Sequence, residues 1–509
     1  MLSVIEAPSV YTGNMKIQLV YAPIRQSGKR GEFFINTWPP LGIMYLASYL
    51  KKKFPGKLKI KLLDGTLWGV EKTVEDVVRF APDILGISAV TSNSTGGYDL
   101  AKKVKEKRPK TLIVFGGVHA SALPEEVYQN SPTDLVAIGE GEQTLLEIVQ
   151  TVSRKKSDFA KINGLALHKN NQVVKTPARQ FIANLDNIPF PAYELLEHRE
   201  KYFGWYFRKQ SPETVIMTTR GCPFHCFFCT DVIWKSSRPY LRVRSPKNIV
   251  DELEILAKKY GIKEYFDGAD EFNCSESWAI SVCQEIIKRK LKFTWKCQLR
   301  ADKVSDELAK NLAEAGCWYV HLGVESGNQK TLDGIGKKIT LGQIKEACRT
   351  LKKYGLKVNL LLMLFNIWEK DGKLVYEDAA ASLKTLEFAK HFLSQNLADF
   401  YGWSVTTPYP GTPLFRFCLR HNLIPQEMLG HWEKWNNIWS LTVNLPKVSR
   451  YDYNRVKLTG ALWQSWYMFR KMGAGVNISS TSDLAGRALI IITLFLKMVK
   501  DRLFEKGTR

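Results

Sequence analysis

Apolar and polar residues alternate over the first 150 positions in a rhythm that predicts strands and helices in turn. Short apolar runs, typical of buried strands, are each followed by a segment with apolar residues at helical spacing. This succession predicts a doubly wound parallel sheet of flavodoxin-like layout, with its ligand at the carboxyl ends of the strands. The strands are predicted at Lys16–Tyr21, Leu58–Leu63, Ile84–Ala89, Leu112–Gly116 and Leu135–Ile138, and the helices near Leu41–Lys53, Val74–Phe80, Tyr98–Glu106 and Gln143–Val152.

The same rhythm resumes after residue 211 and predicts a second α/β domain. Six strand candidates separated by helical patterns suggest a partial (β/α)6 barrel, whose catalytic face would again be the carboxyl edge. These strands are predicted at Val215–Thr219, Glu264–Asp267, Phe293–Gln298, Tyr319–Gly323, Lys357–Leu364 and Phe400–Thr406.

The segments outside these two rhythms divide the remaining chain. Residues 153–210 are rich in turn signals and prolines, which favours an irregular linker. Residues 426–509 carry many aromatic residues and helical patterns, which fits either a helical core or an apolar cap over a cavity. We therefore expect an extension at 1–14, a first domain at 15–152, the linker at 153–210, the barrel at 211–425 and a helical C-terminal region at 426–509.

Length and charge narrow the class of protein. A chain of 509 residues is too long to fold around one hydrophobic core, so two or three domains are expected. Six of its nine cysteines are scattered singly, which fits a reducing cytoplasm better than a disulfide framework. The net charge of +23 suits nucleic acid, an anionic membrane surface or plain solubility. No helix-turn-helix, zinc-finger or RNA-binding signature is visible, so nucleic acid is the weakest of the three. Residues 447–509 hold twelve Lys or Arg and four Asp or Glu, which points to peripheral membrane contact through the tail.

Three cysteines stand in one short loop, at Cys222, Cys226 and Cys229, in a CxxxCxxC pattern. Three thiolates at this spacing can hold three irons of a cubane iron-sulfur cluster and leave the fourth iron open to a ligand. A zinc site completed by His225, or three buried thiols, are the alternatives. Zinc ligands usually come as separated CxxC pairs, so the cluster is the better interpretation.

The run from Thr218 to Cys229 resembles the cluster loop of the radical S-adenosylmethionine (SAM) enzymes. The resemblance implies a 4Fe-4S cluster on Cys222, Cys226 and Cys229, with the amino and carboxylate groups of SAM on the open iron. One electron from the cluster would then cleave SAM to a 5'-deoxyadenosyl radical that abstracts hydrogen from carbon. Phe228 matches the aromatic residue that this family often carries near the adenine.

Three loops of the first domain carry small polar residues or glycines after a predicted strand. Each alone could be an ordinary turn or helix cap. Together, in order and spacing, the chain resembles the cobalamin-binding domain found ahead of radical SAM domains, over roughly residues 15–180. The resembling runs are Pro39 to Ala47, Pro82 to Ser88, Gly116 to His119 and Gly139 to Glu142. The implied cobalamin contacts are Thr91, Ser92, Asn93, Gly116, Gly117, His119, Gly139, Glu140 and Gly141.

One departure concerns the cobalt ligand. Cobalamin domains that bind through histidine carry Asp-x-His-x-x-Gly after the second strand, whereas this chain reads Asp64 to Gly69 without a histidine. The resemblance to the subgroup without this ligand implies cobalamin held with no protein histidine, with Thr91 to Asn93 under the corrin. His119 is a substitute ligand to weigh, although a histidine after a Gly-Gly turn is more often a packing or hydrogen-bonding residue.

Polar residues after the barrel strands are the candidates for holding SAM. The resemblance implies Asp270 as a contact of the SAM amine, Arg300 as a fork for its carboxylate, and Glu325 with Ser326, in the family's GxES pattern, beside the amine or ribose. The acidic run around Asp270 could instead be a solvated turn, and its carboxylates could also serve a metal.

The fifth barrel loop departs from the family. The glycine-rich Gly-x-Pro-Gly-Glu-Thr expected there is replaced by Phe365 to Gly372, so the loop is rebuilt for another substrate or the adenine side of the SAM site is changed. Thr407 to Leu414 follows the sixth strand as a proline-rich loop over the barrel mouth. This run also resembles the anaerobic cyclase and methylase branch of the cobalamin radical SAM enzymes.

These features predict a cytoplasmic enzyme, with peripheral membrane contact through its basic tail, that uses cluster, SAM and cobalamin to act on an unactivated carbon. C-methylation of a small or lipid-like substrate is favoured, with an external donor of the flavodoxin or ferredoxin type supplying electrons. An anaerobic oxidative cyclase of the porphyrin type is the alternative, and a non-catalytic cobalamin or cluster sensor a second one. Methylthiolation is disfavoured, because no cysteine precedes Cys222 to hold a second cluster.

Overall fold

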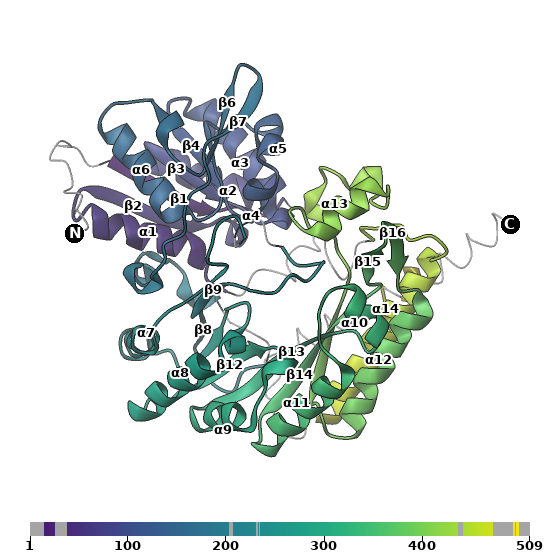
Figure 1. Cartoon of the computed structure of the whole chain (residues 1–509). Coiled ribbons are helices and arrows are strands. Elements are labelled where there is room, and N and C mark those ends of the chain that lie inside the picture. The colour runs from purple at the N-terminus through teal and green to yellow at the C-terminus, as the bar shows by residue number, and fades with distance from the viewer. Residues whose placement is uncertain are drawn as a thin grey trace.

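The computed structural model confirms an α/β chain built around two sheets, one above the other in Figure 1. It describes residues 15–25, 38–202, 207–230, 233, 235–435, 441–471, 492–493 and 495–497. The predicted extension at 1–14 and most of the basic tail beyond residue 471 lie outside these ranges. Within them, no helix is long and apolar enough to cross a bilayer.

The first sheet has the predicted flavodoxin-like order. In the described part of the chain it has seven strands, in the order β2-β1-β3-β4-β5-β6-β7, and the first five of these are parallel. The order reverses between β1 and β3, which is where such folds bind their ligands. The strands are β1 (Met15–Tyr21), β2 (Leu58–Asp64), β3 (Ile84–Ser88), β4 (Leu112–Gly116), β5 (Leu135–Ala137), β6 (Leu165–Lys169) and β7 (Gln172–Lys175).

Helices cover both faces of this sheet, because its strands are apolar on both sides. Along β1, Ile17 and Leu19 point into one apolar core and Val20 into the other, as alternation along a strand requires. The first core contains α1 and α6, and it continues into the barrel; the second contains α2, α3 and α5. The helices are α1 (Leu41–Lys53), α2 (Gly69–Phe80), α3 (Ser94–Lys107), α4 (Val118–Ala122), α5 (Pro124–Asn130) and α6 (Gly141–Ser153).

The predicted linker is more ordered than its composition indicated. Strands β6 and β7 form an antiparallel hairpin that extends the first sheet beside β5. The prediction of an irregular segment from residue 153 was wrong here, because Asn170 and Asn171 adopt the positive φ angles of a tight hairpin turn. Further along, Tyr193 and Leu196 are buried against the barrel.

The second sheet is the predicted partial barrel. Its six described strands are all parallel, in the order β17-β14-β13-β12-β11-β8. The strands are β8 (Glu213–Ile216), β11 (Glu264–Asp267), β12 (Thr294–Leu299), β13 (Cys317–Glu325), β14 (Lys357–Leu364) and β17 (Phe400–Val405). The helices between them are α7 (Pro246–Tyr260), α8 (Glu276–Lys288), α9 (Asp306–Glu314), α10 (Gln329–Gly334), α11 (Leu341–Lys353) and α12 (Ala379–Ser394).

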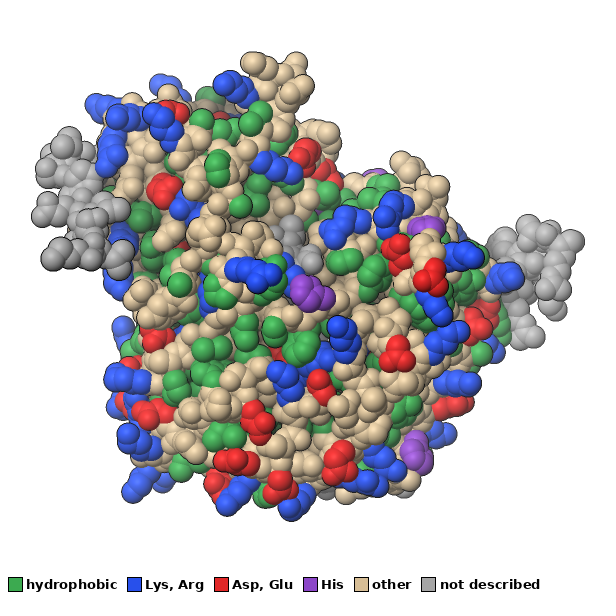
Figure 2. All heavy atoms as spheres, viewed as in Figure 1, with side chains coloured by type: hydrophobic (Ala, Val, Ile, Leu, Met, Phe, Trp, Pro, Cys, Tyr) green, Lys and Arg blue, Asp and Glu red, His purple; other side chains and the backbone are tan. Residues whose placement is uncertain are grey.

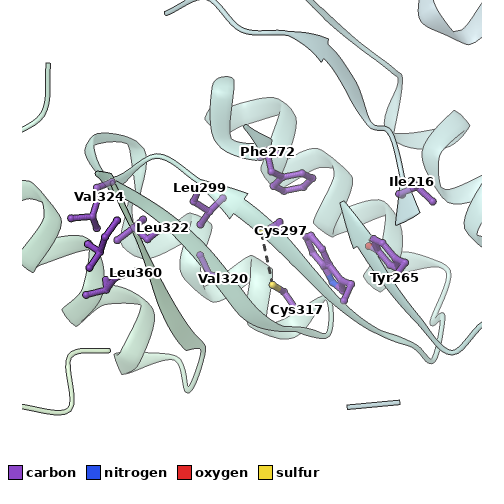
Figure 3. Close-up of a cluster of buried hydrophobic side chains, with 14 of the residues drawn as sticks. Ile216, Tyr265, Phe272, Cys297, Leu299, Cys317, Val320, Leu322, Val324 and Leu360 are labelled. Carbon is purple, nitrogen blue, oxygen red and sulfur yellow. Dashed lines mark hydrogen bonds between the residues drawn. The ribbon is translucent and has the colours of Figure 1, made fainter. Parts of the chain in front are cut away.

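The two faces of the second sheet carry different residues. Toward the helices, neighbouring strands contribute a continuous apolar layer, in which Tyr265, Cys297, Leu322 and Leu360 lie side by side (Figure 3). On the concave face, fully buried Lys296 contacts the carboxylates of Glu213 and Glu264 at the amino ends of the strands. This buried ion cluster lies at the end of the barrel opposite the carboxyl edge.

The chain returns to the first domain after the barrel. Helix α13 (Pro413–Arg420) lies beside the first domain in Figure 1, and α14 (Arg450–Lys471) packs against α12 and β17. Between them, the short helix Trp432–Lys434 contacts α3 and Thr91–Asn93. On the face shown in Figure 2, Lys and Arg side chains are spread over both domains and do not gather in one patch.

Candidate functional site

The cysteine loop leaves the barrel at the carboxyl end of β8 and is framed by two short strands. Strands β9 (Thr219–Gly221) and β10 (Leu241–Val243) pair antiparallel on either side of the loop. Cys222 and Cys226 are half-buried and Cys229 is exposed. Backbone hydrogen bonds hold the loop from both sides: the Phe227 amide donates to Ile335 at 2.9 Å, and the Leu414 amide donates to Phe227 at 3.0 Å.

The three thiols lie close enough for Cys226 to affect the pKa of both Cys222 and Cys229. Partial burial raises the pKa of Cys222 to about 11, with Glu271 and Asp270 adding to the effect and Cys226 contributing. Burial also raises the pKa of Cys226, while the cations Lys337 and Arg300 act in the opposite direction. Loading with metal must therefore remove protons from these thiols.

The donor set fits a cluster better than a single zinc ion. Among the described residues, no three His, Cys, Asp or Glu side chains converge tightly enough to hold one metal ion. A cubane does not require such convergence, since each thiolate binds a separate iron. The zinc alternative also needs His225, whose Nδ1 instead accepts from Lys235 Nζ at 3.1 Å.

The altered fifth barrel loop, which begins at Phe365, packs against the cysteine loop. Its residues form a hairpin of β15 (Ile367–Lys370) and β16 (Lys373–Tyr376), turned at Asp371 and Gly372 with positive φ angles. Trp368 of this hairpin is 5% exposed and packs in a cluster with Ile335 and Met363, against which Phe227 and Phe228 lie. The predicted contact Phe228 thus belongs to an apolar shell beside the cluster ligands.

Arg300 and Glu325 come together around a lysine that the sequence did not indicate. Lys337 Nζ donates to Glu325 Oε1 at 2.9 Å, and an Arg300 amino group donates to the Lys337 carbonyl. The Arg300 guanidinium lies 3.8 Å from the ring centre of Phe224 and 2.7 Å from Asp302. Two cations and two carboxylates therefore surround the inner side of the cysteine loop.

The structure separates the two other predicted SAM contacts. Asp270 is exposed at the end of β11 and affects the pKa of Cys222 and Cys229, so it lies at the cysteine loop. Ser326 is fully buried, and its hydroxyl donates to Glu377 Oε1 at 2.8 Å. Glu377 also accepts from Thr331 at 2.8 Å, so Ser326 faces the protein interior.

A cavity of about 270 Å³ opens at the carboxyl ends of β1, β3 and β4, at the switch point of the first sheet. Its walls are mostly apolar, and both domains contribute to them. The first domain supplies Leu19, Leu41 to Ile43, Tyr45, Leu46, Gly86 to Ser88, Val114, Gly116, Gly117, Ala137, Gly139 to Glu142, Leu145 and Ile148, and the barrel side supplies Met217, Arg220 and Ile233.

Two of the predicted glycines leave open space at this cavity. A β-carbon on Gly139 would meet no atom within 4 Å, and one on Gly116 would reach only Ala137 at 3.6 Å. Gly117 differs, because a β-carbon there would lie 2.4 Å from the Ala89 carbonyl oxygen and its φ is +97°. Open, glycine-lined, apolar surface of this kind fits one arm of a cobalamin.

Thr91 to Asn93 and His119 do not line that cavity. The Asn93 side chain bonds backbone atoms on both sides, accepting from Val90 N and donating to the Ala22 carbonyl at 2.9 Å each. His119 is fully buried, bonds the Tyr98 hydroxyl at 2.8 Å and lies edge-on to Trp432. Burial lowers the pKa of His119 to about 4, so it is neutral at pH 7.

The remaining predicted contact, Glu140, bonds to the barrel domain. Its carboxylate accepts from Arg220 and Arg242, which flank the cysteine loop. Sequence reasoning did not indicate four residues of the site: Lys337, Trp368, Glu377 and Arg242. Each of them acts through tertiary contacts, and none belongs to a recognisable motif.

Comparison with known proteins agrees with this geometry. The radical SAM superfamily matches residues 216–373, and the B12 binding domain matches residues 34–149. An uncharacterised methyltransferase of Pyrococcus horikoshii is 34% identical over 429 residues, which are 83% of this chain and 87% of the relative. Anaerobic magnesium-protoporphyrin IX monomethyl ester cyclase of Rubrivivax gelatinosus is 30% identical over 394 residues, 76% of this chain and 67% of that protein.

A solved structure has the same fold. The cobalamin-dependent S-adenosylmethionine radical enzyme OxsB, with aqua-cobalamin and S-adenosylmethionine bound, matches with a TM-score of 0.70 and 19% identity, over 89% of this chain and 67% of that one. A cysteine triad at a barrel mouth, a glycine-lined cavity beside it and relatives of this extent identify the family. The chain belongs to the cobalamin-dependent radical SAM enzymes, and its cofactors are a 4Fe-4S cluster, S-adenosylmethionine and cobalamin.

Proposed function

We propose that this enzyme is a C-methyltransferase that acts on an unactivated carbon of a small or lipid-like substrate. The observation that carries the proposal is the cavity shared by the two domains, because Arg220, two residues before Cys222, lines the same cavity as Gly116 and Gly139. The cluster supplies the electron that splits SAM, and cobalamin supplies the methyl group that reaches the substrate radical. The protein's part is to keep both cofactors at one substrate.

The SAM side of the site is assigned to the residues around the cysteine loop. Cys222, Cys226 and Cys229 hold three irons and leave the fourth for SAM. Arg300 and Lys337 offer positive charge to the SAM carboxylate, and Asp270 and Glu325 offer acceptors to its amine. Ser326 acts one step back, since its hydroxyl is bonded to Glu377.

The cobalamin side is assigned to the carboxyl edge of the first sheet, at Gly116, Gly117, Gly139 and Gly141. The position of the missing histidine is occupied by Thr66, whose hydroxyl donates to Asp64 at 2.6 Å. A β-carbon on Gly65 would lie 2.8 Å from the Tyr21 carbonyl oxygen, so the backbone of this turn packs closely against the end of β1. This packing supports cobalamin bound without a protein histidine.

The electron donor is assigned to an acidic carrier of the flavodoxin or ferredoxin type. Cys229 is exposed, and the chain carries a net charge of +23, which favours encounter with an acidic partner. The predicted membrane contact through the tail stays a prediction, because most of that tail lies outside the described residues.

Oxidative ring closure is the second candidate function. The 30% identity to a porphyrin cyclase over 76% of this chain favours it. The two functions differ in their SAM products: methyl transfer through cobalamin yields S-adenosylhomocysteine beside 5'-deoxyadenosine, and cyclisation yields 5'-deoxyadenosine alone.

The test is anaerobic purification, reconstitution with iron, sulfide and hydroxocobalamin, and mass spectrometry of the SAM products under a strong reductant. We expect both products from the wild-type enzyme. Cys226→Ala should abolish both together with the cluster absorbance, while Cys283→Ala, on a buried cysteine of α8, should retain them. Formation of 5'-deoxyadenosine alone would replace the methyltransferase by the cyclase.

A further inference from the structure

Two arginines face each other at the base of the cysteine loop. Arg220 on β9 and Arg242 on β10 are register partners in the antiparallel pair, and residues 222–240 form the loop between them. The Arg242 side chain is buried, at 2% exposed, and the Arg220 side chain is 11% exposed. Two neighbouring guanidinium groups in such a place repel each other unless carboxylates compensate them.

The compensation comes from the other domain. Glu140 lies between β5 and α6 of the first domain, and its Oε1 accepts from Arg220 Nη1 at 3.0 Å and from Arg242 Nη2 at 2.8 Å. Its Oε2 accepts from Arg242 Nη1 at 2.9 Å. Glu142, at the start of α6, accepts from Arg220 Nη2 at 2.6 Å. The two carboxylates and two guanidiniums form a neutral, buried cluster, which we name the interdomain clamp.

Aromatic rings fix the clamp further. The Arg242 guanidinium lies 4.2 Å from the ring centre of Phe181 and donates to the Ile182 carbonyl at 3.1 Å. Arg220 lies 5.2 Å from the ring centre of Tyr45, on α1. The clamp therefore joins the cysteine loop to α1, to the start of α6 and to the segment that connects the two domains.

The clamp also changes the role of Glu140. Both of its carboxylate oxygens are bonded to arginine, and burial would raise its pKa, yet the Arg242 and Arg220 charges hold that pKa below the usual range. An oxygen pair committed in this way is a poor hydrogen-bond acceptor for a cofactor. Yet Glu140, Glu142 and Arg220 all line the shared cavity, so the clamp forms the part of the wall nearest the cysteine loop.

We infer that the interdomain clamp positions the cysteine loop relative to the cobalamin cavity, and that Glu140 is a positioning residue and not a cobalamin contact. A buried ion cluster adds little net stability, but its geometry selects one arrangement of the parts it joins. The consequence rests on the proposed methyl transfer: a weakened clamp lets SAM cleavage continue while fewer radicals meet the methyl group. Cleavage and methyl transfer become uncoupled.

The central experiment compares Glu140→Gln with Glu147→Gln. Glu147 is a matched control on α6, because it also forms a two-point ion pair with an arginine, but with Arg179, which is not part of the clamp. Hydrogen exchange of the apo-protein is measured over residues 219–243. Iron content, cobalamin affinity from the absorption spectrum, and the ratio of S-adenosylhomocysteine to 5'-deoxyadenosine are measured on the reconstituted protein.

We expect Glu140→Gln to bind iron and cobalamin within twofold of the wild type, to exchange at least fivefold faster over residues 219–243, and to lower the product ratio at least threefold. Glu147→Gln should match the wild type in all four measurements. Loss of cobalamin affinity with unchanged exchange would make Glu140 a direct cofactor contact and overturn the inference. Unchanged exchange and unchanged ratio would overturn it as well.

Exchanging the charges of Glu140 and Arg242 distinguishes a positioning role of the clamp from a general requirement for folding. If Glu140→Gln does not fold, Glu140→Asp takes its place, and the double variant Glu140→Arg with Arg242→Glu restores a neutral cluster. The double variant should recover slow exchange beyond either single variant, and failure to recover it would contradict the clamp. Should the wild-type enzyme yield no S-adenosylhomocysteine, the proposed methyl transfer fails, while hydrogen exchange still decides whether the clamp holds the loop.

Discussion

A single ammonium group distinguishes the inner side of the cysteine loop. Although burial alone would lower it, Glu325 and the Cys226 thiolate raise the pKa of Lys337 above its ordinary value, so the side chain stays charged. It is 11% exposed and therefore poorly screened by water. A cation beside a cluster ligand stabilises the reduced, more negative cluster.

Lys337→Met should therefore make the cluster harder to reduce. We expect a midpoint potential more negative by about 60 mV, which is a factor of ten for a one-electron couple. Lys338→Met is the matched control, because Lys338 is adjacent and exposed. The measurement is an anaerobic redox titration followed by electron paramagnetic resonance. Equal potentials for both variants would show that Lys337 does not influence the cluster.

The same scale explains which site residues could be predicted. The cysteines, Asp270, Arg300 and Glu325 stand at or shortly after the carboxyl ends of strands, and this position in the sequence is enough to place them at the barrel mouth. Lys337 follows a short helix, and it reaches the site only because Arg300 bonds its carbonyl and Glu325 its ammonium group. His119 also follows a strand, but it does not reach the cofactor cavity, because the turn after β4 directs it toward Tyr98 and Trp432.

At the scale of elements, hydrophobic periodicity predicted the parallel strands well. The predicted and observed bounds agree for α1, β4, β11 and β14, and they differ by a few residues elsewhere. The hairpins β6/β7 and β15/β16 were missed. Their strands are short and carry exposed charged residues such as Lys175 and Lys370, so their alternation lacks a clear apolar face. Each hairpin closes at a tight turn, and only its first strand, β6 or β15, buries apolar residues.

The β15/β16 hairpin should be required for a stable cysteine loop. Trp368→Ala removes a buried ring that packs with Ile335 and Met363, which should destabilise the protein by about 3 to 5 kcal/mol. It should also reduce the iron retained after gel filtration. Trp466→Ala, on half-exposed Trp466 of α14, should change stability by less than about 1 kcal/mol. The measurement is urea unfolding with iron analysis. Full iron retention in Trp368→Ala would contradict a supporting role for the hairpin.

At the scale of the whole molecule, three of the contacts that join the first domain to the rest of the described chain lie apart from one another. The interdomain clamp is one, the stack of Trp38 on Phe266 at 5.6 Å is a second, and the contact of Trp432 with His119 and Glu126 is a third. The cofactor cavity lies among residues of both domains. Conditions that charge a group inside these contacts should therefore loosen the assembly as a unit.

Acid should act in this way through the buried histidines. Burial lowers the pKa of His119 to about 4 and, together with the Lys296 charge, that of His321 to about 3. An unfolded histidine titrates near pH 6.5, so below that pH the unfolded chain binds more protons and stability falls. Between pH 7 and pH 5 we expect a loss of about 2 kcal/mol for each of the two histidines.

Urea unfolding of the apo-protein at both pH values measures this loss. His119→Gln should reduce the loss of stability between pH 7 and pH 5 by about 2 kcal/mol, whereas His168→Gln, on an exposed histidine of β6, should leave it unchanged. An unaltered pH dependence in His119→Gln would mean that His119 is not held neutral in the fold.

The contact between Trp432 and Glu126 has a consequence for synthesis on the ribosome. These residues are 306 positions apart, and the whole barrel is translated between them. The first domain can form its own sheet early in synthesis. The surface around His119, however, stays exposed to solvent until Trp432 has been translated. A translation product that stops inside the barrel should therefore emerge with this surface uncovered and be recognised by chaperones at that place.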